Sequence, residues 1–161
     1  MQLPEGLKRV AVLCVLKHQN QFLLLKRLKE PFKDHYTPVG GKVDLFEDPY
    51  TAALRETQEE TGITVPAMQY CGVLIETSPT KYNWISFVYV AEIDFLPPPA
   101  CNEGTLEWID FENLLNMPTP KTDWFIYKFL LENKTFTLNA LYNDAIELIE
   151  MNEMITNEKL V

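Results

Sequence analysis

Apolar side chains occur along this chain in short runs that are broken by turn-forming residues. The first two runs are separated by His18, Gln19 and Asn20, which is typical of two strands joined by a tight turn. Later runs end at Pro79, at three successive prolines, 97–99, and at Asn143. The pattern predicts strands over residues 10–16, 21–25, 68–76, 84–93, 106–109, 135–142 and 145–149.

One helix is predicted by its ends as well as by its interior. Asp48 is a good N-cap, Pro49 suits the first helical position, and Gly62 suits the C-terminal stop. Two further helices are predicted over residues 111–115 and 124–131. The order of these elements predicts an α/β (α+β) fold of the sandwich type, with a mixed β-sheet between helices.

Length and composition predict one small folded domain over residues 1–161. Apolar residues make up 47% of the chain, which is well above a disordered composition. The cysteines Cys14, Cys71 and Cys101 lack metal-binding spacing. Because Cys14 and Cys71 lie in apolar runs, we expect them to be buried free thiols.

The formal net charge of −9 argues against binding of a nucleic acid polymer through a basic surface. No apolar run approaches the length of a membrane span, and residues 1–10 lack the apolar core of a signal peptide. We therefore expect a cytoplasmic protein, monomer or homodimer, that binds a small molecule rather than a membrane. An anionic ligand would need help from cations, and Lys42, directly after a pair of glycines, is the best candidate among the basic residues.

The predicted helix over residues 49–61 carries an unusual acidic cluster. Glu56, Glu59 and Glu60 are three and four positions apart, so they share one side of the helix. Like charges at these spacings repel, and they either remain in water or are neutralised by cations. Hard cations such as Mg²⁺ prefer carboxylate oxygens and substrate phosphates. Arg55 lies four positions before Glu59 and can also reach Glu47, so it would orient the carboxylates.

The segment from Gly41 to Ile63, GKVDLFEDPYTAALRETQEETGI, resembles the signature of the Nudix hydrolase family, G-x5-E-x7-R-E-U-x-E-E-x-G-U, in which U is a bulky apolar residue. Every charged and glycine position is present. The one departure is Thr57 at the first U position, which faces the packing side of the helix. The alternative, a solvated acidic helix, explains a single Glu-Glu pair but not the whole string.

The resemblance implies a Nudix-type α/β/α sandwich and hydrolysis of nucleoside diphosphates linked to another moiety, with Mg²⁺ or Mn²⁺. Glu56 and Glu60 then correspond to metal ligands, and Glu59 to a further ligand or a base. The backbone carbonyl of Gly40 would contact a metal. In the same resemblance the supporting pair is Glu47 and Arg55.

Substrate choice must come from outside the signature. Residues 8–150, with the segment NEGTLEWI at 102–109, resemble the MutT/MutX-type enzymes that convert oxidised purine nucleoside triphosphates such as 8-oxo-dGTP to monophosphates. This resemblance implies that Glu103 reaches back to the metal site. The alternative is a loop carboxylate without a role.

The same resemblance places base recognition at Thr37, Asp123 and Trp124. Aromatic stacking and a few directed hydrogen bonds would read a purine, and a carboxyl group at Asp123 could bind an N–H on its edge. Asp123 could instead be a helix cap and Trp124 a core residue. Related enzymes often carry an asparagine where this chain has Thr37, which weakens the case for an oxidised guanine.

Two alternative functions remain open from the sequence. Pro79 lies sixteen residues after Ile63, near the offset of a proline in Nudix ADP-ribose pyrophosphatases. A proline in a turn also has a simple structural explanation. An ADP-sugar pyrophosphatase is therefore the second candidate, and a nucleotide-sensing Nudix module without turnover is the third. The complete carboxylate set argues against the third.

Overall fold

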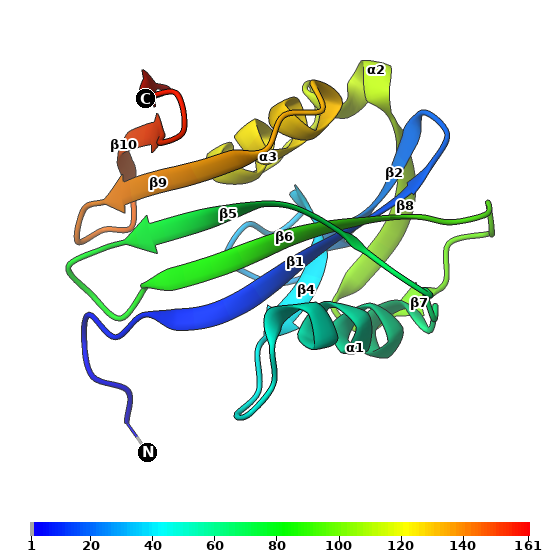
Figure 1. The fold of residues 1–161 in the computed structure, drawn as a ribbon, viewed down its shortest axis with the longest axis horizontal. Helices are drawn as coiled ribbons and strands as arrows, with labels where there is room; N and C mark the ends of the chain where they lie inside the picture. Colours follow the sequence, from blue (N-terminus) through cyan, green and yellow to red (C-terminus); the bar gives the residue numbers. More distant parts are fainter. Residues whose placement is uncertain (1) are drawn as a thin grey trace.

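The computed structural model describes residues 2–161, and in this range one mixed β-sheet packs against helices (Figure 1). None of the helices in this range has the length and apolar character needed to cross a bilayer. The helices are α1 (Pro49–Thr61), α2 (Phe111–Leu114) and α3 (Lys121–Leu131). The strands are β1 (Arg9–His18), β2 (Gln21–Arg27), β3 (Tyr36–Thr37), β4 (Val39–Lys42), β5 (Gln69–Thr77), β6 (Trp84–Glu92), β7 (Ala100–Cys101), β8 (Gly104–Asp110), β9 (Phe136–Tyr142), β10 (Leu148–Glu153) and β11 (Glu158–Lys159).

The strands follow the order β11-β10-β9-β5-β6-β1-β2-β8-β7 across the sheet. The pairs β1–β6 and β5–β9 are parallel, and the other pairs are antiparallel. Strand β1 is the branch point, because β2 pairs with its C-terminal part and β4 pairs with its N-terminal part. In this register Val12 lies opposite Gly41, and Leu13 opposite Gly40. The glycine pair is thereby fixed against the central strand.

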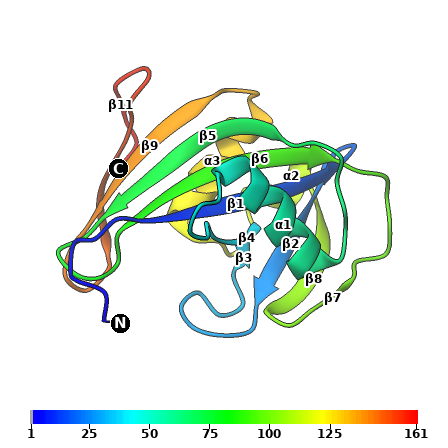
Figure 2. The same cartoon turned by 60° about the horizontal axis from the view of Figure 1, so that its bottom comes forward.

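Alternation along β1 divides the interior into two apolar layers. Val12, Cys14 and Leu16 face α1, whereas Leu13 and Val15 face the cluster that contains α3. Figure 2 shows α1 in front of the sheet and α3 behind it. A strand with both faces covered in this way is apolar throughout, which explains the continuous apolar run that the sequence shows here.

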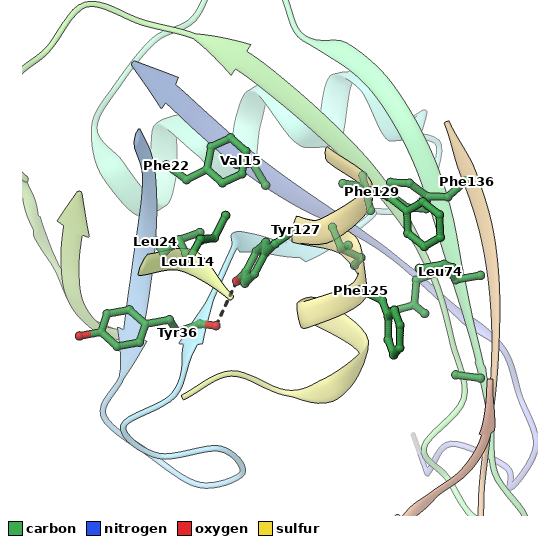
Figure 3. Packing of buried hydrophobic residues seen from close by; sticks show 14 of the residues in the cluster. Val15, Phe22, Leu24, Tyr36, Leu74, Leu114, Phe125, Tyr127, Phe129 and Phe136 are labelled. Atoms are coloured by element: carbon green, nitrogen blue, oxygen red, sulfur yellow. Dashed lines mark hydrogen bonds between the residues drawn. The ribbon is translucent and has the colours of Figure 1, made fainter. Parts of the chain in front are cut away.

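Aromatic side chains join α3 to the C-terminal strands. Phe129 of α3 lies 5.7 Å from Phe136 of β9, centroid to centroid. The buried hydroxyl of Tyr127 donates to the backbone carbonyl of Tyr36 at 3.0 Å, as the dashed line in Figure 3 shows. The helix therefore connects β9 and β3 to one core.

The predicted fold class, a mixed sheet between helices, is confirmed. Helix α1 has the predicted bounds, because Asp48 accepts the Thr51 N–H at its start and Gly62 adopts a φ of 73° at its end. Helix α3 begins at Lys121 rather than at residue 124, and β10 covers Leu148–Glu153 rather than residues 145–149. Cys71 is half-buried rather than buried. The sequence pattern did not predict β3, β4, β7 and β11, which have two to four residues each.

Phe136 tests whether the C-terminal strands belong to the same core. We expect Phe136→Ala to lower the free energy of unfolding by about 3–5 kcal/mol, because it leaves a cavity against Phe129. Phe136→Leu keeps most of the volume and should cost less. Denaturant unfolding measures both. A loss below about 1 kcal/mol for the alanine variant would show that β9 is only loosely attached.

Candidate active site

Helix α1 packs against the sheet by small residues and keeps its carboxylates beside β4. Ala52 and Ala53 are fully buried, and so is Thr57, the residue that departs from the signature. The Thr57 hydroxyl lies 4.0 Å from the sulfur of Met68. Thr57 therefore serves the packing side, as its position in the sequence predicts, and the glutamates remain on the opposite side.

Arg55 holds the acidic groups of this region together. Its Nε donates to Oε2 of Glu47 at 2.8 Å, and its Nη2 donates to Oε1 of the same residue at 2.9 Å. Its Nη1 donates to Glu56 at 2.8 Å and to Glu59 at 3.0 Å. These hydrogen bonds lower the pKa of Glu47 to about 2 and raise the pKa of Arg55. The bidentate contact with Glu47 ties the loop before α1 to the helix.

The glycine pair of β4 makes room for this arrangement. A Cβ at Gly41 would overlap the carboxylate of Glu56, and a Cβ at Gly40 would overlap the carbonyl oxygen of Val12. The Arg55 Nη2 also donates to the backbone carbonyl of Lys42 at 3.0 Å. Strand β4 can therefore lie close enough to α1 for its backbone to accept a hydrogen bond from Arg55.

Glu60 feels the negative charge of other carboxylates nearby. Burial, followed by the negative charges of Glu56 and Glu103, raises the pKa of Glu60 to about 7. In the part of the chain that the structure describes, no three acidic, histidine or cysteine side chains converge as a ready metal site. The chemistry of the group nevertheless fits a hard divalent cation, since Mg²⁺ prefers carboxylate and carbonyl oxygens and would offset this repulsion.

A cavity of about 490 Å³ opens beside these glutamates. Glu60, Glu103, Lys42 and Asp123 line this cavity. Apolar side chains of the sheet, including Leu13 and Leu74, line it as well. Six of the residues predicted for the site line this cavity: Thr37, Gly40, Lys42, Glu60, Glu103 and Asp123.

Asp123 lies in the first turn of α3 and is 8% exposed. The helix is capped by Pro120, without a side-chain capping bond, so Asp123 is not the N-cap. Burial, followed by the nearby charge of Glu76, raises the pKa of Asp123 to about 8, although Arg27 opposes the rise. The carboxyl group is therefore protonated at neutral pH and can donate a hydrogen bond.

The remaining predicted residues do not line the cavity. Glu47, Arg55, Glu56 and Glu59 form the ionic cluster behind it. The structure does not bring Trp124 to the cavity at all. Its indole N–H donates to the carbonyl of Leu115 at 3.0 Å, and its ring packs against the apolar core that contains α3. Stacking of a base on Trp124 is therefore incompatible with this geometry.

Several cavity residues were not predicted from the sequence. Glu76, Tyr82 and Tyr142 line the cavity together, and Trp84 does so as well. The alternation of β5 contained a signal for Glu76, because Gly72, Leu74 and Glu76 occupy its buried positions. Tyr82 lies in a loop and Tyr142 at the end of a strand. The sequence pattern around such positions does not predict where their side chains point.

The sequence profile of the NUDIX domain matches residues 7–133. The chain belongs to the Nudix family. Nudix hydrolases act on nucleoside diphosphate derivatives and generally use divalent metals such as Mg²⁺. The predicted family is thus confirmed, together with the signature helix at its centre.

Known Nudix proteins resemble the chain to different extents. The Nudix hydrolase YvcI of Bacillus subtilis, itself uncharacterised, is 28% identical over 146 residues, which are 84% of this chain and 88% of YvcI. An 8-oxo-dGTP diphosphatase of Proteus vulgaris is 34% identical over 47% of this chain and 68% of its own length. An ADP-ribose pyrophosphatase of Methanocaldococcus jannaschii is 33% identical over 52% of this chain and 50% of its own length.

Among solved structures, the mutator protein MutT of Bacillus halodurans superimposes with a TM-score of 0.80. The superposition covers 91% of this chain and 98% of the MutT chain, at 24% sequence identity. At that identity the likeness establishes the fold and not the substrate.

Arg55 should be irreplaceable even by lysine. We expect Arg55→Lys to lower kcat by about 10- to 100-fold, as is typical when a group that orients metal ligands is lost. An ammonium group cannot make the bidentate contact with Glu47 while also reaching Glu56 and Glu59. Steady-state kinetics over a Mg²⁺ titration measure the effect.

The matched control for this variant is Glu92→Gln. It breaks an exposed ion pair with Lys17, 3.5 Å in length, outside the cavity. Such a pair contributes little, so kcat should not change. Equal activity of Arg55→Lys and the unmodified protein would show that the ionic cluster does not position the catalytic groups.

The raised pKa of Asp123 predicts a pH-dependent contribution to stability. Between pH of about 4 and 8 the folded protein retains a proton at Asp123 that the unfolded chain has released. Stability from this group therefore falls as pH rises through that window. Asp123→Asn cannot ionise, so the Tm difference, variant minus unmodified protein, should increase from pH of about 5 to 8.5. A constant difference would mean that Asp123 has an ordinary pKa.

Proposed function

We propose that this protein is a Mg²⁺-dependent nucleoside triphosphate pyrophosphohydrolase. Its substrates would be purine deoxynucleoside triphosphates, including oxidised ones such as 8-oxo-dGTP, and its products a monophosphate and pyrophosphate. One observation carries the proposal: the acidic groups Glu60 and Glu103 and the buried carboxyl of Asp123 line the same cavity. A ligand with phosphates at one end and a hydrogen-bonding base at the other suits such a cavity.

In this proposal one group of residues holds the metal ion, and a second group contacts the phosphates of the substrate. Glu56, Glu60, Glu103 and the Gly40 carbonyl would hold Mg²⁺. When bound, the cation would neutralise charge on the phosphates, and it would lower the pKa of a water molecule that it binds. Lys42 and Arg27 line the cavity and offer positive charge to the phosphates.

Arg55 orients Glu56 and Glu59 without facing the cavity, so it is a positioning residue. Glu47 has the same role through its two hydrogen bonds from Arg55. Glu59 is half-exposed and outside the cavity lining, which suits a group that exchanges protons with solvent.

Hydrolysis of ADP-ribose or another ADP-sugar is the second candidate. A relative of comparable identity is named an ADP-ribose pyrophosphatase, and Pro79 lies in the loop that also carries the cavity residue Tyr82. A nucleotide-sensing module without turnover is the third candidate.

A product analysis separates the three candidates. The protein is incubated with Mg²⁺ and, separately, with 8-oxo-dGTP, dGTP, dATP and ADP-ribose. Release of pyrophosphate and monophosphate from a triphosphate supports the proposal. Release of orthophosphate alone, or cleavage of ADP-ribose only, would overturn it, and binding without turnover would favour the sensing module.

Glu60→Gln tests the acidic group directly. We expect kcat to fall by about 10²-fold or more, comparable with the roughly 10²–10³-fold cost of removing one group that stabilises transition-state charge. Tm without metal should not fall, because the substitution removes a carboxylate that Glu56 and Glu103 repel. Near-normal turnover of Glu60→Gln at saturating Mg²⁺ would remove Glu60 from the catalytic group.

A further inference from the structure

A second buried carboxyl group, Glu76, lies in the cavity and has no place in the Nudix signature. It continues the inward face of β5 after Gly72 and Leu74, and only 5% of it is exposed. Glutamate is rarely buried to this extent without partners, because its desolvation is costly. Its surroundings therefore indicate what the group does.

Two phenols hold the Glu76 carboxyl group by one oxygen. The hydroxyls of Tyr82 and Tyr142 both donate to Oε2, and their rings meet edge to face at 5.4 Å. Within residues 2–161 no hydrogen bond to Oε1 is present, and Glu76 lines the cavity. This oxygen is free to accept from a ligand.

Glu76 and Asp123 differ in their hydrogen bonding. Burial raises the pKa of Glu76, and the two phenol donors and the charge of Lys8 oppose that rise only in part; both phenols donate to the carboxyl group, which therefore serves as an acceptor. The Asp123 carboxyl lacks any such donor in the described residues, and it keeps its proton more readily. This end of the cavity therefore presents an acceptor from Glu76 beside a donor from Asp123.

Strand pairing places this polar end well away from the glutamate helix. Glu76 of β5 lies opposite Trp84 of β6, and Trp84 lies opposite Arg9 of β1. On the other side of β1, Lys42 of β4 lies opposite Ala11. Three strand spacings, about 14 Å, thus separate the strands of Glu76 and Lys42. A ligand whose phosphates lie at the helix must extend across the sheet to reach Glu76.

Trp84 forms the wall between the two ends. The Arg9 guanidinium lies 4.0 Å from the centre of its ring and covers one face. Trp84 also lines the cavity, so its uncovered surface is available to a ligand. An aromatic wall beside a donor and an acceptor is the chemistry that recognises a planar heterocycle by its surface and edge.

We propose that Glu76 is a specificity-determining residue that accepts a hydrogen bond from an N–H on the edge of a purine base, while Asp123 donates to the adjacent ring or carbonyl atom. This assignment rests on the proposed function, because it requires a nucleotide with its phosphates at α1. Adenine offers an amino N–H beside N1, and guanine offers N1–H beside O6. A ribose hydroxyl both donates and accepts, so recognition of a sugar would not require one carboxyl group that accepts beside another that donates.

Glu76→Gln tests the proposal with two matched substrates. The phenol hydrogens need an acceptor, so the new amide oxygen takes the place of Oε2 and the NH₂ group faces the cavity. A donor then replaces the acceptor. We expect KM for the preferred purine triphosphate to rise about 10- to 100-fold, the cost of a lost hydrogen bond in a buried site, with little change in kcat. KM for purine riboside triphosphate, whose ring edge lacks an N–H, should stay within about threefold.

Two further variants separate recognition from structure. Glu153→Gln changes an equally buried carboxylate that accepts from the backbone N–H groups of Thr137 and Thr156, outside the cavity. It should lower Tm and leave the preference between the two substrates unchanged. Tyr142→Phe keeps the Glu76 carboxylate but removes one donor, and it should raise KM by about 3- to 10-fold for the purine with an N–H edge only.

Each other outcome overturns the assignment. Equal rises in KM for both substrates would give Glu76 a purely structural role, and an effect confined to ADP-ribose would make it a sugar-binding group. If Glu76→Gln does not fold, the same comparison of KM values for the two triphosphates is made with Tyr142→Phe. If the unmodified protein hydrolyses no nucleotide, the proposed function fails, and the dissociation constants of the same two triphosphates still test Glu76.

Discussion

The acidic face of α1 depends on one guanidinium group. Glu56, Glu59 and Glu60 would repel one another on a bare helix, and Arg55 offsets this by donating to two of them and to Glu47. Its planar fork serves partners in three directions, which an ammonium group cannot do. The same guanidinium binds the Lys42 carbonyl, so it sets the position of β4 as well as that of the carboxylates.

The spacing of the signature residues follows from the contacts that Arg55 makes with Glu47, Glu56 and Glu59. Glu47 must precede Arg55 by a loop and two helical turns for both of its oxygens to meet the guanidinium. Gly41 must lack a side chain because the Glu56 carboxylate occupies that space, and Gly40 because the Val12 carbonyl does. The glycines and charges are therefore parts of one packing arrangement between α1, β4 and β1. The Thr57 departure is tolerated because that side of the helix meets Met68 and not the ionic cluster.

The sequence predicts best those features that depend only on residues close together along the chain. Asp48, Pro49 and Gly62 define the ends of α1 without help from the rest of the chain. Short strands such as β3 and β4 have no periodicity of their own and exist because β2 and β1 pair with them. Side-chain destinations also depend on tertiary packing. Trp124 and Asp123 are neighbours in sequence, yet the turn of α3 sends one to the Leu115 carbonyl and the other to the cavity.

The two ends of the cavity come from different parts of the chain. The end that we propose for the phosphates includes residues of the signature helix and β4, inside the region 7–133 that matches the family. The other end requires Tyr142, the last residue of β9, which lies beyond that region and reaches the cavity only because β9 pairs in parallel with β5. The relatives named for 8-oxo-dGTP and for ADP-ribose each align with about half of this chain, 47% and 52%. Similarity of that extent is compatible with shared phosphate chemistry and different ligands. This difference in origin is consistent with our proposal that selectivity is decided at Glu76 and Asp123 rather than at the glutamate helix.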